Sequence, residues 1–123
     1  MPASLAALKA MFDAFNAHDL DRFMTFVAED AVLDMPRGPD PWGRRYVGKA
    51  AVREGLASRL KGLPDVHYAD ESHFVDGDMG ISHWTLTGTT PAGEKIKVHG
   101  CDFFGFRGDK VVKKSSFWKI VEK

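Results

Sequence analysis

Three short turns divide the second half of the chain into four segments that are typical of β-strands. The turns lie at residues 76–78, 91–93 and 107–109, and each contains a glycine together with aspartate, proline or arginine. Strands joined by such tight turns pair with their neighbours along the chain in antiparallel fashion. The pattern therefore predicts an antiparallel meander built from four strands, at residues 66–75, 81–89, 94–106 and 110–121.

The first half of the chain is typical of helices instead. Apolar residues recur with helical spacing over residues 5–15 and again over residues 20–27. Ser4 and Asp19 precede these two stretches, and their side chains are suited to cap the helices. A third helical stretch covers residues 49–60, with its apolar side chains on one side.

A short strand and a loop separate the second and third helices. Residues 31–35 are partly β-branched and precede a proline, which predicts a brief strand. Three prolines and two glycines fall within residues 36–43, so we expect a loop that proline restricts. Helices that come first and strands that come last imply an α+β domain with its helices on one face of the sheet.

Composition limits the classes of function. The 123 residues suit one domain, residues 1–123, and 17 Lys and Arg balance 17 Asp and Glu. This balance argues against binding to nucleic acid or to an anionic membrane surface. The single cysteine, Cys101, excludes an internal disulfide and a Cys-rich zinc site. With no secretory signal pattern and no apolar run of about 18 residues, we expect a cytoplasmic protein.

The last two strands place an acid and an amine on one face. If residues 107–109 form a three-residue loop, Phe106 lies opposite Lys110 and Asp102 lies opposite Lys114. A mostly apolar face with a few polar groups is typical of a small-molecule site. A two-residue loop would shift this register and undo the pairing. The residues predicted to share the face are Asp102, Phe104, Phe106, Val112, Lys114, Ser116 and Trp118.

The sequence allows two interpretations of the Asp102–Lys114 pair. The carboxylate can act as a general acid or base, with the ammonium group tuning it or stabilising an enolate. The alternative is a cross-strand ion pair without chemistry, since structural pairs also occur in such surroundings.

Two further groups of residues have side chains that can act as ligands. His83 and His99 are expected to be cross-strand neighbours, but no third ligand joins them because alternation turns Asp102 to the other face. We therefore expect interface or surface histidines and no metal site. Arg44, together with Trp42, lies in an arginine-rich segment that either clamps an anionic or aromatic ligand or anchors the loop.

The order helix, helix, short strand, helix and four-stranded meander resembles the nuclear transport factor 2-like superfamily. The likeness rests on residues 15–21, 29–32, 48–53 and 102–118, and it covers nearly the whole chain. Within the superfamily the chain is most similar to the SnoaL-like branch, which includes polyketide cyclases. The resemblance implies a cone-shaped α+β barrel. In it, three N-terminal helices pack on a curved antiparallel four-stranded meander plus one short strand, and enclose a pocket.

The resemblance also suggests roles for single residues. The oxyanion-hole aspartate of the ketosteroid isomerases lies on the third meander strand, where Asp102 stands, and an aromatic residue of their pocket corresponds to Trp118. Their general base and first-helix tyrosine correspond to Met35 and Met11, so ketosteroid isomerase activity is not expected. SnoaL-like cyclases use an aspartate for an intramolecular aldol closure without metal or cofactor, and Asp102 fits that position.

Two functional hypotheses follow. The first is a cofactor-independent acid/base enzyme of the polyketide cyclase or isomerase type, which acts on a small hydrophobic carbonyl compound in an enclosed pocket. Its catalytic residues would be Asp102 and Lys114, with Trp42 and Arg44 over the mouth. The second is a non-catalytic module of the same fold that binds a small ligand or dimerises. The residues expected to contact the substrate are Asp34, Trp42, Arg44, Trp84, Phe104, Ser116 and Trp118.

A homodimer is expected under either hypothesis. Members of the superfamily often dimerise through the outer face of the sheet. In the predicted register this face exposes Phe103, Val111 and Phe117, and such apolar patches usually mark an interface. Asp34 would face the pocket only if a bulge in the first strand turned it inward.

Overall fold

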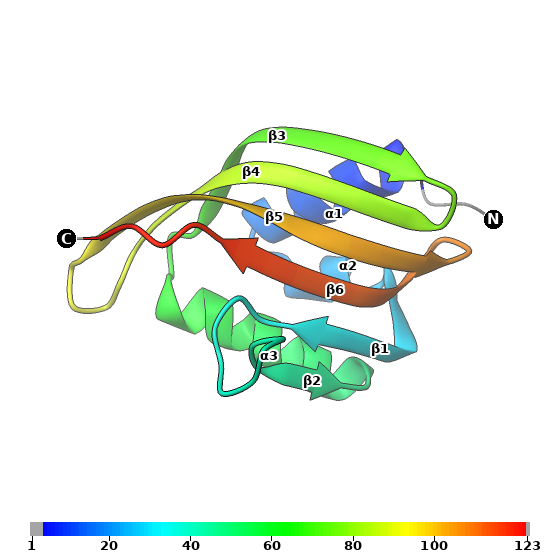
Figure 1. The fold of residues 1–123 in the computed structure, drawn as a ribbon, viewed down its shortest axis with the longest axis horizontal. Helices are drawn as coiled ribbons and strands as arrows, with labels where there is room; N and C mark the ends of the chain where they lie inside the picture. The colour runs from blue at the N-terminus through cyan, green and yellow to red at the C-terminus, as the bar shows by residue number, and fades with distance from the viewer. Residues whose placement is uncertain (1–3, 123) are drawn as a thin grey trace.

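The computed structural model describes residues 4–122 and has the α+β architecture that the sequence predicts (Figure 1). The described elements are α1 (Leu5–Asn16), α2 (Leu20–Met24), β1 (Val27–Asp34), β2 (Arg45–Val47), α3 (Lys49–Gly62), β3 (His67–Asp76), β4 (Met79–Thr89), β5 (Lys95–Arg107) and β6 (Lys110–Trp118).

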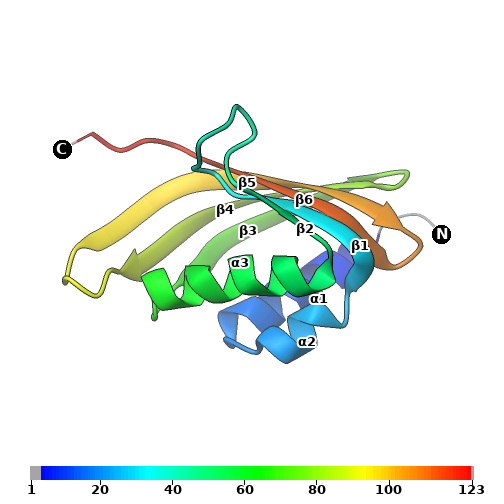
Figure 2. The same ribbon diagram turned by 90° about the horizontal axis from the view of Figure 1, so that it is seen from below.

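Within residues 4–122 the strands form one curved sheet in the order β2-β1-β6-β5-β4-β3. The meander from β3 to β6 is antiparallel, as predicted. The first strand joins it by running parallel to β6, and β2 adds one further strand that the sequence did not predict. Figure 2 shows all three helices on one face of the sheet, and the loop between β1 and β2 stands on the opposite face.

Both predicted helix caps are confirmed. The side chain of Ser4 accepts a hydrogen bond from the backbone N–H of Ala7, and that of Asp19 accepts one from Arg22. The second helix ends at Met24, earlier than predicted. Val27 instead opens β1 and pairs with Val111 of β6, because strand pairing outweighs a helical apolar spacing in so short a segment.

The hairpin between β5 and β6 is tighter than predicted. Arg107 lies opposite Lys110, so the turn has two residues instead of three. A bulge follows at once, because Phe106 pairs with Val111 whereas Gly105 pairs with Lys113. The predicted pairing of Phe106 with Lys110 was therefore wrong.

The bulge restores the alternation of side chains further along the hairpin. Asp102 lies directly opposite Ser116 instead of Lys114. The three residues 114, 116 and 118 of β6 nevertheless share the inner face with Asp102, because the tighter turn and the extra residue cancel in parity. Val112 was predicted on this face, but Val111 takes the place and is only 2% exposed.

The outer face of the sheet therefore lacks Val111 but keeps its aromatic residues. Phe103 and Phe117 are 40% and 53% exposed, and their rings meet edge to face with centroids 5.6 Å apart. Two neighbouring strands extend this apolar row, since Phe103 pairs with Ile81 and Ile81 pairs with Phe74.

The core lies between the inner face of the sheet and the helices. Trp84 and Phe104 are its largest fully buried side chains. Gly100 makes room for the indole ring, because a Cβ at this position would lie 2.5 Å from Trp84. The Trp84 indole therefore packs directly against β5, the strand that carries Asp102.

Candidate functional site

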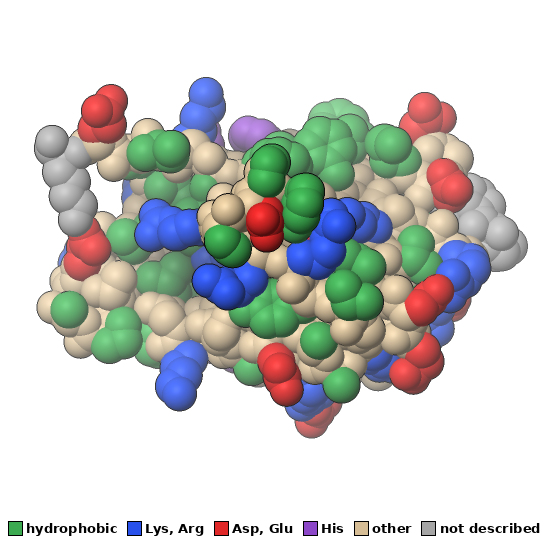
Figure 3. Space-filling model, turned by 60° about the horizontal axis from the view of Figure 1, so that its bottom comes forward, with side chains coloured by type: hydrophobic (Ala, Val, Ile, Leu, Met, Phe, Trp, Pro, Cys, Tyr) green, Lys and Arg blue, Asp and Glu red, His purple; other side chains and the backbone are tan. Residues whose placement is uncertain are grey.

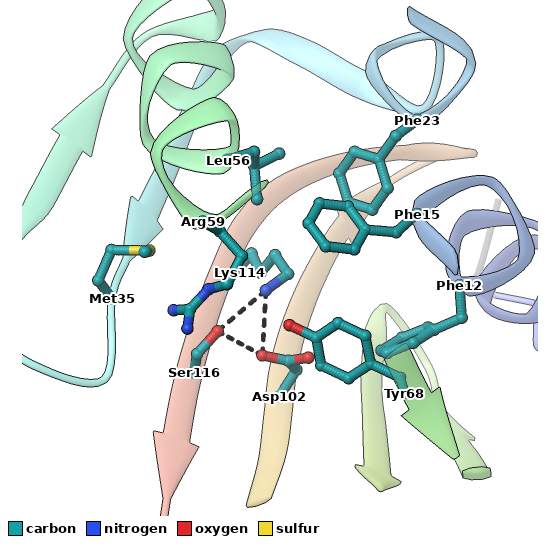
Figure 4. A pocket seen from close by; sticks show the side chains of 10 residues that line it. All are labelled: Phe12, Phe15, Phe23, Met35, Leu56, Arg59, Tyr68, Asp102, Lys114 and Ser116. Carbon is teal, nitrogen blue, oxygen red and sulfur yellow. Dashed lines mark hydrogen bonds and ion pairs between the residues drawn. The ribbon is translucent and has the colours of Figure 1, made fainter. Parts of the chain in front are cut away.

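Asp102 is a fully buried carboxylate at the centre of the inner face. Its Oδ2 accepts a hydrogen bond from Trp84 Nε1 at 3.0 Å, and its Oδ1 accepts one from Lys114 Nζ at 3.1 Å. The hydroxyl group of Ser116 also donates to Oδ1. Lys114 Nζ donates in turn to Ser116 Oγ at 2.9 Å, so the three side chains form the closed triangle that Figure 4 shows.

The strand register brings these groups together. Asp102 and Ser116 are direct partners across β5 and β6, whereas Lys114 lies diagonally and is opposite Phe104. The lysine side chain is long enough to span this diagonal. The ion pair with Asp102 therefore forms although Lys114 is not the direct cross-strand partner that was predicted. The Lys114 ammonium also lies 5.9 Å from the centre of the Phe104 ring.

A narrow pocket opens beside the Asp102 carboxylate, between the sheet and α3 (Figure 4). Its free volume is about 10 Å³, which is room for about one water molecule. The residues that line it are Phe12, Phe15, Phe23, Met35, Leu56, Arg59, Tyr68, Asp102, Lys114 and Ser116. A few polar groups thus converge at one end of a largely aromatic chamber.

Tyr68 contributes a polar group that sequence reasoning missed. Figure 4 shows its hydroxyl directed toward the corner formed by Lys114 and Asp102. Burial raises the pKa of the Tyr68 phenol well above its ordinary value, and the charge of Asp102 adds to this rise. The hydroxyl therefore stays protonated at neutral pH and lies at the wall of the pocket, where it can donate a hydrogen bond to a ligand.

Tyr68 was missed because a bulge interrupts β3. Asp70 has a positive φ of 54°, and the pairing with β4 shifts between Ala69 and Ser72. Counting back from the hairpin turn therefore gives the wrong face for Tyr68. Arg59 left a signal that could have been used, since it follows Val52 and Leu56 on the same helical face.

The predicted site residues fall into two groups, of which the first lies at or behind the pocket. Ser116 lines it together with Asp102 and Lys114. Trp84 and Phe104 are each 1% exposed and support the site from within the core. Trp118 does not line the chamber but adjoins it, because the Arg59 guanidinium carbon lies 4.3 Å from the centre of its ring.

The second group lies away from the pocket, contrary to expectation. Asp34 is buried on the outer face and accepts two hydrogen bonds from Arg45, at 2.8 and 3.0 Å. It also forms an ion pair with Lys113 at 3.0 Å. Leu33 points inward and is fully buried, so its neighbour Asp34 must point outward. The hydrogen bonds from Arg45 hold the pKa of the Asp34 carboxyl below its ordinary value.

The loop that carries Trp42 and Arg44 does not cover the mouth. It stands on the face opposite the helices, and the Arg45 guanidinium lies 4.8 Å from the centre of the Trp42 ring. Trp42 instead lines a separate hollow with Ser115 and Phe117. Figure 3 shows Lys and Arg side chains on both sides of a group of hydrophobic side chains with an acidic one at its centre. Within this segment, Arg45 ties the loop to β1 through its hydrogen bonds to Asp34.

A second polar cluster lies on the inner face but outside the pocket. His73 Nδ1 is 2.7 Å from Ser82 Oγ, and His73 Nε2 is 3.0 Å from Glu71 Oε1. A hydroxyl, an imidazole and a carboxylate in this order can form a nucleophilic site. Here Ser82 is fully buried and does not line the pocket, so the chain of hydrogen bonds joins β3 to β4 and offers no nucleophile to a ligand.

The two outer histidines lie near one another. The rings of His83 and His99 are 6.1 Å apart, although His83 pairs directly with Cys101. The two histidines are therefore diagonal neighbours across β4 and β5, as predicted. Residues 4–122 contain no group of three or more His, Cys, Asp or Glu side chains placed to hold a metal ion. The same residues contain no helix long and apolar enough to cross a membrane.

A curved sheet, three helices on one face and a carboxylate in the chamber between them define a protein of the nuclear transport factor 2-like superfamily. The sequence matches the SnoaL-like domain over residues 8–114, so the chain belongs to that family, as its resemblance indicated. No protein of curated function matches the sequence.

Solved structures share the fold over nearly their whole length. A candidate polyketide cyclase from Xanthomonas campestris pv. campestris has 22% identity and a TM-score of 0.82, covering 93% of this chain and 88% of its own. An NTF2-like protein from Burkholderia xenovorans LB400 has 18% identity and a TM-score of 0.77, covering 94% and 88%. TerC, co-crystallised with polyporic acid, has 18% identity and a TM-score of 0.78, covering 94% and 90%.

Proposed function

We propose that this chain is a cofactor-independent acid/base enzyme of the polyketide cyclase or isomerase type, with a small hydrophobic carbonyl compound as its substrate. One observation carries the proposal. A carboxylate, an ammonium group and two hydroxyl groups, from Asp102, Lys114, Ser116 and Tyr68, converge at the end of an aromatic chamber. Membership of the SnoaL-like family and the similarity to a candidate polyketide cyclase support it.

In this proposal, one group transfers the proton and two others stabilise the enolate. Asp102 would take a proton from the carbon next to the substrate carbonyl. The Lys114 ammonium and the Tyr68 hydroxyl would donate hydrogen bonds to the enolate oxygen that forms, in a chamber from which most water is excluded. Asp102 would then return the proton to another carbon. Alternatively, the enolate carbon would attack a second carbonyl of the same molecule and close a ring, and Asp102 would give its proton to the alkoxide oxygen that forms.

Substrate entry requires a side chain at the mouth to move. The free volume beside Asp102 is about 10 Å³, which a carbonyl compound with an apolar body exceeds. Arg59 lines the chamber from α3 and Met35 lines it from the end of β1. Met35 has a long, unbranched side chain that can change rotamer without disturbing the strands.

A second candidate function has an observation in its favour. Both oxygens of Asp102 already accept hydrogen bonds from the protein, and the space beside them is small. These features suit a non-catalytic module, in which the Asp102–Lys114 pair is structural or holds a ligand without converting it. The two candidates differ in whether any substrate is converted.

Exchange of carbon-bound hydrogen for deuterium distinguishes the two candidates. Nuclear magnetic resonance would follow the exchange next to the carbonyl of a panel of aryl ketones and β-diketones. We expect the wild-type protein to exceed the buffer rate, and Asp102→Asn to lose about 100-fold or more of that excess. Asp34→Asn serves as the matched control and should keep the rate. An Asp102→Asn variant that exchanges at the wild-type rate, or a wild-type protein that accelerates no compound, would favour the non-catalytic module.

We further propose that the chain forms a homodimer through the outer face of its sheet. The aromatic pair Phe103 and Phe117 and the neighbouring Phe74 form an apolar row that is 40% to 61% exposed in the single chain. Covering such a row is the usual reason for a twofold contact. Sedimentation equilibrium should show a dimer at micromolar concentration, and Phe103→Ser with Phe117→Ser should give a monomer. A wild-type monomer would contradict the proposal.

A further inference from the structure

We propose that Arg59 binds a carboxylate at the mouth of the pocket, so that the ligand is an acid with an apolar body. This inference rests on the proposed function, because it specifies the substrate class of the same pocket. Arg59 belongs to α3 and lines the chamber opposite the Asp102 strand. Figure 4 shows its guanidinium group beside Ser116 and Met35.

Arg59 has no acidic partner within the described chain. Three other arginines are paired with aspartates: Arg45 with Asp34, Arg53 with Asp21, and Arg107 with Asp30. No Asp or Glu of residues 4–122 forms an ion pair with Arg59, which is half-buried. The remaining arginines without an ion pair are exposed to solvent, namely Arg22, Arg37 and Arg44.

The charges that line the chamber do not balance. Lys114 is matched by Asp102, whose Oδ1 lies 3.1 Å from its Nζ. Arg59 then leaves one positive charge beside a wall of aromatic and aliphatic side chains. A charge beside low-dielectric surroundings attracts an opposite charge more strongly than it would in water. The chamber therefore favours a ligand that carries one negative charge.

The contact with Trp118 leaves the guanidinium free to bind. Its central carbon lies 4.3 Å from the centre of the Trp118 ring, which is a cation–π contact and not a hydrogen bond to an acceptor atom. The N–H donors of arginine lie in the plane of the group and match the two oxygens of a carboxylate. Trp118 thus holds Arg59 in place while its donors remain available. The substrate would enter with its carbonyl end toward Lys114 and its carboxylate at the mouth.

The test compares two ligands of the same shape. Cinnamate carries a carboxylate where cinnamamide carries a neutral amide, and isothermal titration calorimetry at pH 7 would measure both affinities. We expect wild-type protein to bind cinnamate about tenfold more tightly than cinnamamide, which corresponds to one charge-assisted contact. Arg59→Gln should lose this preference by weakening cinnamate alone, and Arg59→Lys should keep part of it. The unchanged affinity for cinnamamide then shows that the variant is folded.

Arg53→Gln is the matched control, because Arg53 lies on the same helix but pairs with Asp21 outside the pocket. This variant should keep the wild-type preference for cinnamate. The inference is overturned if wild-type protein binds both compounds equally, if it binds neither, or if Arg59→Gln keeps the preference. The proposed function is judged separately by deuterium exchange with uncharged ketones. Exchange that depends on Asp102 without any preference for cinnamate would leave the enzyme standing and remove the role of Arg59.

Discussion

Two buried aspartates lie beside consecutive lysines of β6 and belong to different kinds of site. Asp34 forms an ion pair with Lys113 at 3.0 Å, and Asp102 forms one with Lys114 at 3.1 Å. Their exposed fractions are 2% and 0%. Because successive side chains of a strand point to opposite faces, one pair lies on the outer face and the other on the inner face.

The surroundings of the two carboxylates separate their roles. Asp34 is held by the two-pronged contact of Arg45, whose side chain is 39% exposed, and it does not line the aromatic chamber. Asp102 meets Lys114, whose side chain is 12% exposed, at the end of an aromatic chamber. Burial and an ion pair are therefore shared by a structural carboxylate and a candidate catalytic one. What distinguishes them is that Asp102 lines the aromatic chamber and Asp34 does not.

The largest expected effect on stability comes from removing the inner carboxylate. Asp102→Ala leaves the Lys114 ammonium buried without its partner, so unfolding in urea should become easier by about 3 kcal/mol. The double variant Asp102→Leu with Lys114→Met should recover most of this loss, because it removes both charges. A double variant no more stable than Asp102→Ala would show that the ion pair is not the reason.

A smaller effect is expected from the indole that supports the inner carboxylate. Trp84→Phe removes the N–H that donates to Asp102 Oδ2 and keeps most of the packing. It should lower the free energy of unfolding by about 2 kcal/mol, as for a hydrogen bond to a charged group. Trp42→Phe, on the outer loop, is the control and should change little because its side chain is 46% exposed. Equal losses of unfolding free energy in the two variants would contradict the view that the Trp84 hydrogen bond to Asp102 stabilises the fold.

The outer carboxylate should contribute in a manner that depends on pH. The pKa of Asp34 is held below its ordinary value, so its pairing stabilises the fold above the unfolded pKa of about 3.9. This contribution is lost as the pH falls through the lower pKa of the folded state. Asp34→Asn should therefore be less stable than wild type at pH 7 and approach it below about pH 4. Urea unfolding at several pH values measures the gap, and a gap that widens on acidification would contradict the account.

The smallest effect concerns Cys101, the neighbour of Asp102. Burial raises the pKa of its thiol, and the charge of Asp102 raises it further. Alkylation by iodoacetamide at neutral pH should be slow, since only the thiolate reacts. Asp102→Asn should speed the reaction modestly and Asp34→Asn should not. Identical rates in the two variants would show that the Asp102 charge does not reach the outer face.

Local patterns predicted most of the fold. The caps at Ser4 and Asp19, the amphipathic helices and the meander all depend on residues close together in the chain. The association of Asp102, Lys114 and Ser116 was also predictable, because it needs only the alternation of side chains in one hairpin.

Features set by long-range pairing were not predictable in the same way. The bulges beside Phe106 and at Asp70 shift the strand register without a distinct sequence signal. The bulge at Asp70 is the reason why the inward direction of Tyr68 was not predicted. The outward direction of Asp34 follows from the pairing of β1 with β6, two strands far apart in the sequence. The polar side chains of the β5–β6 hairpin were therefore predictable from the sequence, whereas the positions of Tyr68 and Asp34 were not.

The most direct measurement uses two side-chain N–H groups as reporters. Trp84 Nε1–H donates to Asp102 and Arg45 Nε–H donates to Asp34, and both give signals in a nitrogen-15 correlation spectrum. Titration with acetophenone should shift the Trp84 signal until it saturates and leave the Arg45 signal in place. A spectrum in which Arg45 moves instead, or in which neither signal moves, would contradict the claim that the inner carboxylate is the functional one.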